Sequence, residues 1–140
     1  MPAEAFSDDW AREWGEILNG RSVYKETAAD WEGSVALIMT RDSSPDAERK
    51  AVFVDLWHGQ CRAARTATEA DLEEARYVLT GTAASWREVL TGKLAPLMAV
   101  MGGKIRLSRG SMSSLVPRAA AARELVAAAT GMETRFPAGW

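Results

Sequence analysis

The sequence predicts a single domain of the α/β (α+β) class, and three observations carry this prediction. Five segments alternate polar and apolar residues with the period of two that marks a half-buried strand. Other segments repeat apolar residues at spacings of three and four, as amphipathic helices do. The 140 residues, of which 47% are hydrophobic and 26% charged, suit one globular domain with a sizeable core.

The first 40 residues predict two helices and a strand. Ser7 fits the N-cap of a helix whose first turn is acidic and which ends at Asn19-Gly20. Ser22 can start a second, short helix. Gly33 then introduces a strand from Ser34 to Thr40, with every second residue apolar on one side.

The middle of the chain predicts two further strands joined by a tight turn. The segment Arg41–Lys50 is polar, and its Ser43-Ser44-Pro45-Asp46 run indicates a turn or loop. Strands follow at Ala51–Trp57 and Gln60–Thr66, with His58-Gly59 between them. Because these connections are short, we expect the strands to pair antiparallel.

A loop with one helical turn is predicted over Thr68–Glu74, followed by a fourth strand over Arg76–Gly81. Apolar spacing places the start of the next helix near Thr82. That helix leads into Gly92–Leu107, which predicts a short apolar helix framed by glycines and then a fifth strand from Lys104.

The short apolar helix has one predicted buried face, formed by Leu94, Leu97, Met98 and Met101 at spacings of three and four. Pro96 suits its first position, where a missing N–H costs nothing. Methionine is flexible and polarizable, so two methionines on this face can fill the core or adapt to a flexible ligand.

A last helix is predicted from Ser114 to Gly131, because Pro117 is tolerated only within its first turn. Beyond it lies a tail, residues 131–140, which carries Met132, Phe136 and Trp140. We expect this apolar tail to be covered, either by filling a groove of its own chain or by docking on a second subunit. The whole chain, 1–140, is then one domain with its core over residues 6–130.

Charge is distributed unevenly along the chain. Residues 1–88 hold 17 acidic and 10 basic residues, whereas residues 89–123 hold no acidic residue. Six basic residues fall in that second stretch: Lys93, Lys104, Arg106, Arg109, Arg118 and Arg123. Such a zone can attract an anionic head group or a membrane surface, or simply be solvated. A pI near 5.5 argues against nucleic-acid binding.

Catalytic and metal sites are poorly supported by the residue types present. His58 is the single histidine and Cys61 the single cysteine, short of any zinc pattern. With Asp55 they could form a Cys–His–Asp group, but on one strand and turn we expect them to point in different directions. No phosphate-binding loop or dinucleotide fingerprint occurs. We therefore expect no catalytic residue, metal or cofactor, and binding rather than an enzyme.

The expected location is cytoplasmic. The first residues, Met1–Ser7, lack the basic start and apolar core of a secretory signal. No apolar run approaches the ~20 residues of a membrane span. A lone cysteine fits a reducing compartment.

Residues 77–115 contain a series of short motifs, which are Gly92-Lys93-Leu94-Ala95-Pro96, the methionines of the following helix, Gly103-Lys104-Ile105-Arg106-Leu107, and Gly110-Ser111. Together these motifs resemble the sterol-binding domain of the sterol carrier protein type 2 family, the non-specific lipid-transfer proteins. Ala95 stands where the family often has Asn or Asp, and Ser111 replaces the Asp of the family. The resemblance extends more loosely over residues 6–130.

The resemblance implies a five-stranded mixed, mainly antiparallel sheet with helices that enclose a hydrophobic tunnel on one face. It implies a lipid or fatty-acyl ligand and leaves sterol, fatty acid and acyl-CoA open. The expected wall is Trp86, Val89, Leu90, Leu97, Met98, Met101, Ile105, Leu107, Leu115 and Val126. Lys93, Lys104 and Arg106 are the candidates to attract an anionic head group.

Two functions remain open at this level. The protein either binds or carries a lipid or fatty-acyl ligand, with transient contact to a membrane surface. Alternatively, it is a non-enzymatic interaction or dimerisation domain whose groove is filled by a partner, by a second copy in a homodimer, or by its own tail.

Overall fold

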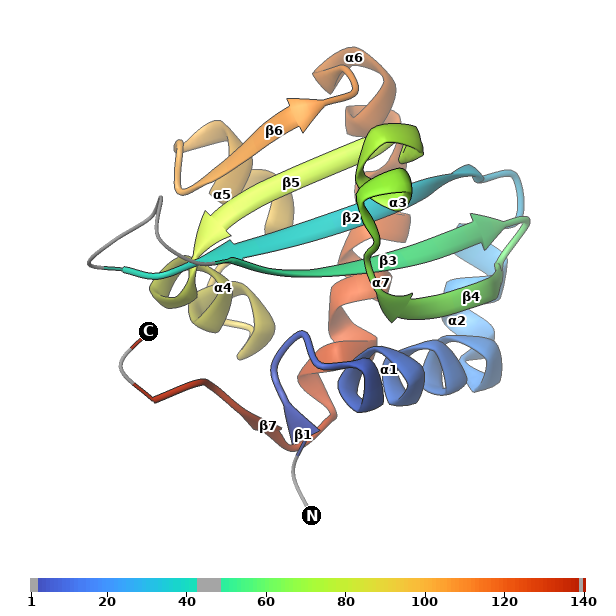
Figure 1. Cartoon of the computed structure of the whole chain (residues 1–140). Coiled ribbons are helices and arrows are strands. Elements are labelled where there is room, and N and C mark those ends of the chain that lie inside the picture. The colour runs from blue at the N-terminus through green and yellow to red at the C-terminus, as the bar shows by residue number, and fades with distance from the viewer. Residues whose placement is uncertain (1–2, 43–48, 139) are drawn as a thin grey trace.

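A five-stranded sheet organises the protein (Figure 1), in the computed structural model that describes residues 3–42, 49–138 and 140. The strands lie in the order β4-β3-β2-β5-β6. Their bounds are β2 Glu32–Thr40, β3 Arg49–Trp57, β4 Gln60–Thr66, β5 Tyr77–Thr82 and β6 Ile105–Arg109. Two short strands, β1 Ala3–Glu4 and β7 Thr134–Arg135, form a separate parallel pair. The five predicted strands are thus confirmed.

The sheet is mixed, as the family resemblance implies. β2, β3 and β4 form an antiparallel meander, and β6 pairs antiparallel with β5. β5 pairs parallel with β2, so the chain crosses from the β4 edge to the other side of β2. The turn between β3 and β4 places His58 at φ +49° and Gly59 at φ +81°, the left-handed geometry of a two-residue hairpin turn.

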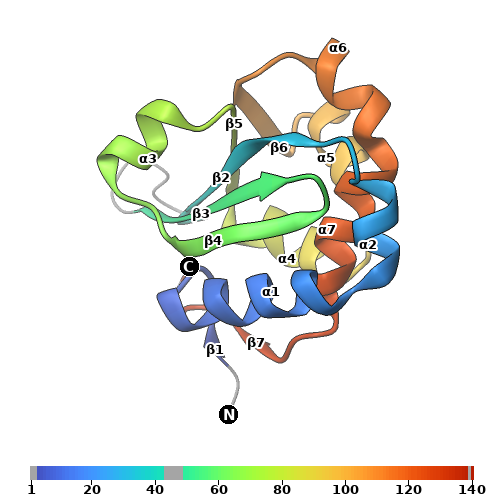
Figure 2. The same cartoon turned by 90° about the vertical axis from the view of Figure 1, so that its right-hand side faces the viewer.

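Most helices cover one face of the sheet. They are α1 Asp8–Gly20, α2 Ser22–Thr27, α4 Ala83–Leu90, α5 Pro96–Met101, α6 Met112–Leu115, a 3-10 turn Val116–Arg118 and α7 Ala119–Thr130. α3, Glu69–Glu74, lies on the opposite face from α4, α5 and α7 (Figure 2). The main core lies under the helices, and a smaller cluster around Ile38, Phe53 and Val78 packs with Leu72 of α3.

Local sequence signals explain where several helices begin. The Ser7 hydroxyl accepts a hydrogen bond from Trp10 N at 3.2 Å and caps α1, as predicted. The Thr82 hydroxyl accepts from Ser85 N and caps α4. At α3, Thr68 and Asp71 form a reciprocal capping box. The predicted turn at residues 43–46 lies outside the described residues.

The last helix differs from the prediction. The expected single helix from Ser114 is instead α6, a 3-10 turn and then α7, which starts at Ala119. Pro117 provides the physical reason, because it lacks an N–H and its ring obstructs the preceding turn of an α-helix. The helical segment also starts earlier than the predicted Ser114. Ser111 is the N-cap of α6, and its Oγ accepts a hydrogen bond from Ser114 N at 3.2 Å.

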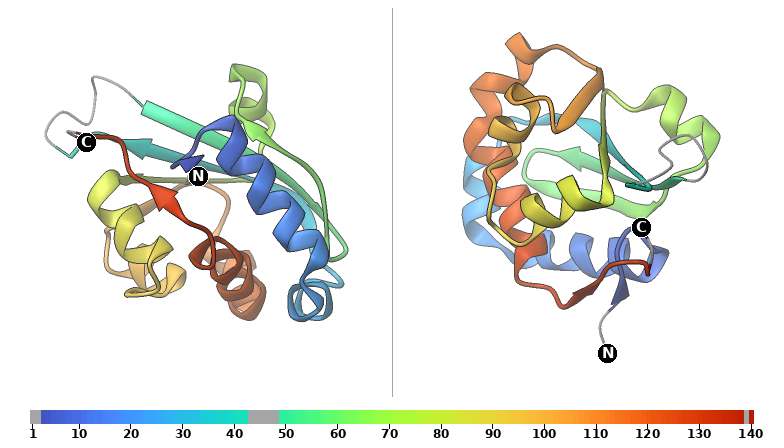
Figure 3. Two further views of the ribbon diagram at one scale, coloured as in Figure 1. Left: turned by 90° about the horizontal axis from the view of Figure 1, so that it is seen from below. Right: turned by 90° about the vertical axis from the view of Figure 1, so that its left-hand side faces the viewer.

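The tail packs on its own chain. β7 runs beside β1 at the end of the molecule opposite α6 (Figures 1 and 3). Thr134 Oγ1 accepts a hydrogen bond from Trp10 Nε1 at 3.0 Å, and Met132 is buried. The Trp140 ring lies 5.4 Å from Lys50 Nζ. In the part of the chain that the structure describes, no helix has both the length and the apolar character to cross a membrane.

Candidate ligand pocket

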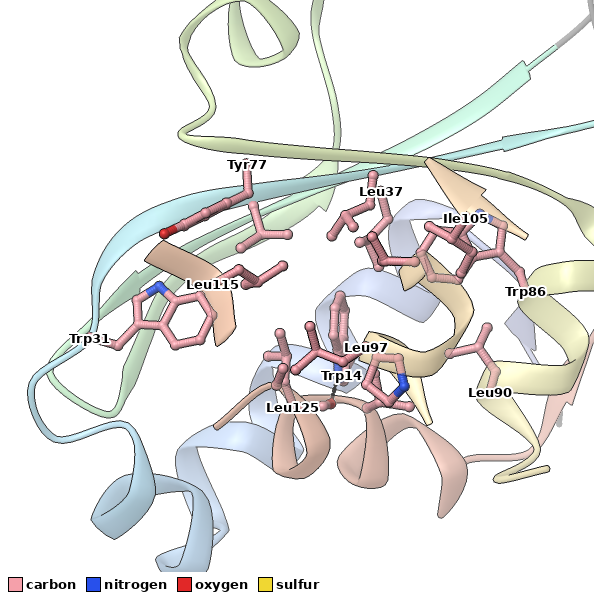
Figure 4. A pocket seen from close by; sticks show the side chains of 16 residues that line it. Trp14, Trp31, Leu37, Tyr77, Trp86, Leu90, Leu97, Ile105, Leu115 and Leu125 are labelled. Carbon is pink, nitrogen blue, oxygen red and sulfur yellow. Dashed lines mark hydrogen bonds between the residues drawn. The ribbon is translucent and has the colours of Figure 1, made fainter. Parts of the chain in front are cut away.

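An apolar cavity lies between the helix-covered face of the sheet and α4, α5 and α7 (Figure 4). Its volume is about 50 Å³. The sixteen lining residues are Trp14, Trp31, Val35, Leu37, Tyr77, Leu79, Trp86, Leu90, Pro96, Leu97, Val100, Ile105, Leu115, Ala122, Leu125 and Val126. Among the described residues, no charged side chain belongs to this lining, so the cavity suits a hydrocarbon.

The three tryptophans of the lining differ in how their ring N–H groups are bonded. Trp14 Nε1 donates to the Leu125 carbonyl at 2.9 Å, and Trp86 Nε1 donates to the Ile38 carbonyl at 2.9 Å. Trp31 Nε1 is buried and has no hydrogen-bond partner among the described residues. Trp31 and Tyr77 lie at one end of the cavity, and Trp86 lies at the other (Figure 4).

A polar pocket of about 100 Å³ adjoins the Trp31 end of the cavity. Trp31 and Tyr77 belong to both linings. The polar pocket is completed by Glu32, Arg76, Ser114 and Arg118. The hydroxyls of Tyr77 and Ser114 are 2.8 Å apart and hydrogen-bonded. The polar pocket therefore combines hydroxyl, indole and guanidinium donors with one carboxylate, that of Glu32, next to an apolar cavity.

A groove of about 220 Å³ adjoins the cavity on a different side. Residues of α7 and of the segment from α4 to the start of α5 line it, including Leu94, Ala95 and Arg123. Pro96 and Val126 line both the groove and the cavity. These two side chains consequently separate the cavity from the outer groove.

The predicted wall residues are partly brought together. Six of them line the cavity: Trp86, Leu90, Leu97, Ile105, Leu115 and Val126. Val89 is buried but lines the groove instead, and Leu107 packs against the core without lining the cavity.

The predicted burial of the two methionines is wrong. Met98 and Met101 are 59% and 70% exposed, and neither lines the cavity. α5 begins only at Pro96, so Leu94 precedes it and the predicted face is rotated. The side that reaches the cavity carries Leu97 and Val100, which are three residues apart.

The three predicted head-group candidates lie outside both the cavity and the polar pocket. Lys93, Lys104 and Arg106 are exposed, and Lys104 Nζ pairs with Glu88 Oε2 at 2.8 Å. The guanidinium groups near the cavity instead come from Arg76 and Arg118. Sequence reasoning missed Arg76 because no local pattern links it to Trp31, which lies far earlier in the chain.

The residues of the conceivable Cys–His–Asp group have other partners. His58 Nε2 is 2.7 Å from Glu32 Oε1, and Asp55 pairs with Arg62 at 3.1 Å. Cys61 is buried, and burial raises the pKa of its thiol to about 11. A thiol with so high a pKa is a poor nucleophile at neutral pH. Over residues 3–42, 49–138 and 140, no cluster of three potential metal ligands occurs.

Comparison with known proteins relates this architecture to solved structures. A crystal structure of sterol carrier protein 2 is 40% identical, with a TM-score of 0.83, and the match covers 92% of this chain and 99% of that one. A solution structure of a conserved hypothetical protein from Thermus thermophilus is 38% identical, with a TM-score of 0.83 and coverage of 100% and 97%.

A more distant neighbour shares the fold. It is the solution structure of sterol carrier protein 2 from Aedes aegypti in complex with palmitate, 16% identical with a TM-score of 0.51, and the match covers 85% of this chain and 98% of that one. No curated protein sequence matches the chain. The sequence profile of the SCP-2 sterol transfer family matches residues 15–113. The chain therefore belongs to the SCP-2 sterol transfer family.

Proposed function

We propose that the protein binds a lipid or fatty-acyl ligand in a hydrophobic tunnel and carries it between membranes, without enzymatic activity. The observation that carries the proposal is the apolar cavity, which lies between the polar pocket and the outer groove and shares two lining residues with each. Membership of the SCP-2 sterol transfer family supports a lipid ligand. The palmitate complex of the Aedes aegypti neighbour agrees with an acyl chain.

Ligand entry requires the cavity to widen. Pockets for small molecules usually measure ~300–1,000 Å³, whereas this cavity measures about 50 Å³. We infer that α5 moves outward, because it is only six residues long and contributes Pro96, Leu97 and Val100 to the lining. Gly92 and Gly103, both at φ +81°, flank the helix and can accommodate backbone rotation. This movement would join the cavity to the groove across Pro96.

The ligand proposal is tested by native mass spectrometry of the purified protein, solvent extraction, and titration with the fluorescent fatty acid cis-parinaric acid. We expect co-purifying acyl lipid or saturable binding with one site per chain. A protein that carries no lipid and binds no probe would refute the proposal.

Membrane contact is proposed at α5. Met98 and Met101 project outward from the helix that also covers the cavity, and Val116 is 52% exposed. Exposed apolar side chains beside a lipid site favour contact with a bilayer interface. The double variant Met98→Gln/Met101→Gln should slow transfer of a fluorescent fatty acid between vesicles at least about fivefold, with unchanged binding in solution. Unchanged transfer would contradict this role.

Dimerisation stays the alternative function. The exposed methionines of α5 are the observation that would favour it, since a second copy could cover them. Sedimentation of the wild-type protein and of the same Met98→Gln/Met101→Gln variant separates the two functions. A dimer that dissociates in the variant would favour the interaction domain.

A further inference from the structure

We infer that the polar pocket beside Trp31 binds the carboxylate of a fatty-acid ligand, and that the Trp31 indole N–H donates a hydrogen bond to it. The inference rests on the proposed acyl-binding function and adds the position and orientation of the ligand. The residues concerned are Trp31, Arg76, Tyr77, Ser114 and Arg118. None of them is one of the three head-group candidates predicted from the sequence, although Arg118 lies in the same basic stretch, residues 89–123.

The first argument is the unpaired indole N–H. The Trp31 side chain is 3% exposed, and its Nε1 has no partner among the described residues. A buried donor without an acceptor is unfavourable, and native proteins seldom leave one unpaired. Trp14 and Trp86 line the same cavity, and each donates to a backbone carbonyl at 2.9 Å. Trp31 is therefore the one of these three that is available to a ligand acceptor.

The second argument is the charge next to that donor. A Cβ atom placed on Gly33 would lie 2.9 Å from Arg76 Cδ and 3.6 Å from Trp31 Nε1, so both groups pack against this glycine. Within the described parts of the chain, the Arg76 guanidinium has neither a salt bridge nor a hydrogen bond. A carboxylate beside Trp31 Nε1 can be reached by this free cation.

Glu32 is part of the lining of the polar pocket and Asp30 contacts Arg118 of that lining, and each of these carboxylates has a partner of its own. Glu32 Oε1 is 2.7 Å from His58 Nε2. Asp30 forms a salt bridge with Arg118, and its side chain is 77% exposed. Exposed pairs of this kind are weak, so a ligand carboxylate can compete with Asp30 for Arg118. The Tyr77 and Ser114 hydroxyls, paired at 2.8 Å, supply a further donor.

The third argument is continuity with the apolar cavity. Trp31 and Tyr77 contribute to both linings, and their rings are in edge-to-face contact at 6.0 Å. A carboxylate seated at their polar atoms can extend its chain into the cavity. The methyl end then points toward Trp86 and Leu90 at the far end (Figure 4). The ligand orientation follows from this arrangement.

The test compares dodecanoate with dodecan-1-ol, which share the chain and differ in charge, by isothermal titration. Trp31→Phe keeps an aromatic ring and removes the donor, and Arg76→Met removes the cation. Each should weaken dodecanoate binding about tenfold and change dodecan-1-ol binding less than about twofold. Arg106→Met is the charge-matched control, because Arg106 is exposed on β6 and lines neither the cavity nor the polar pocket. It should change the affinity for neither ligand.

The wild-type protein provides a second readout that needs no stable variant. In a ¹H–¹⁵N spectrum, the Trp31 indole resonance, assigned by its through-space contacts to the neighbouring Tyr77 ring, should shift downfield with dodecanoate and much less with dodecan-1-ol. The Trp14 and Trp86 indoles are internal controls. If both ligands bind but shift the Trp31 resonance equally and respond equally to the variants, the inference is overturned while the proposed function stands. If neither ligand binds, both fail.

Discussion

Filling the cavity with a larger side chain should raise stability and lower ligand affinity at the same time. Ala122 of α7 lines the cavity and is 9% exposed. In Ala122→Leu, three added carbon atoms enter a space of about 50 Å³. Burial of a methylene-sized group contributes ~0.8 kcal/mol, so the gain is at most about 2.4 kcal/mol. Crowding against neighbours offsets part of it, since overpacking costs ~1–3 kcal/mol.

We expect a net stabilisation of about 1 kcal/mol in the free protein, measured by urea unfolding without lipid. With ligand present, the leucine and the acyl chain compete for one space, so the affinity for cis-parinaric acid should fall about tenfold or more. The two effects have opposite signs because, under the proposed function, the acyl chain would occupy the space that the leucine fills.

Ala128→Leu is the matched control. Ala128 lies on the same helix, is 1% exposed and lines neither the cavity nor the two adjoining pockets. The same added carbons should destabilise the protein by ~1–3 kcal/mol and leave affinity within twofold. If Ala122→Leu destabilises the protein as strongly as this control and binds probe normally, the cavity is not the ligand space, and the reasoning is refuted.

Three further outcomes are expected. Asp71→Asn should lower the free energy of unfolding by ~1–3 kcal/mol at pH 7. The hydrogen bond from Arg65 lowers the pKa of Asp71 in the folded state, so the stabilisation is present above pH ~4 and is lost as the pH falls through that lowered pKa. Urea unfolding measures this, and a difference in unfolding free energy between wild type and variant that stays constant down to about pH 2.5 would contradict the prediction. Burial raises the pKa of Cys61 to about 11, so its thiol should react with a thiol-specific disulfide reagent at pH 8 at least about a hundredfold more slowly in the native protein than in the urea-unfolded protein. Equal rates in the two states would show that burial does not protect the thiol. Removing residues 132–140 should lower the free energy of unfolding by about 3 kcal/mol or more, because Met132 is buried and the tail packs on the core. The affinity for the probe should stay within twofold, because no described tail residue lines the cavity. Urea unfolding, sedimentation and probe titration of the truncated protein check these outcomes, and a rise in affinity would show that the tail blocks the ligand.

The sequence by itself determined the secondary structure and the sheet meander closely. The strand Gln60–Thr66 and the turn at His58-Gly59 follow from local alternation and from the left-handed geometry that glycine permits. The helix from Asp8 follows from the Ser7 cap. These features depend on neighbours within a few positions, so a single sequence contains enough information to predict them. The family resemblance added the mixed sheet and was confirmed by the profile match.

Only the tertiary structure decided which side of α5 faces inward and which polar groups meet at the cavity. A six-residue helix has too few turns for periodicity to choose between Leu97 and Met98. The polar pocket depends on the parallel pairing of β2 with β5, which aligns Val35 with Tyr77 and brings Arg76 beside Trp31. That pairing is non-local. It is selected by burial of both strands in the centre of one sheet, and no pattern within either segment encodes its partner.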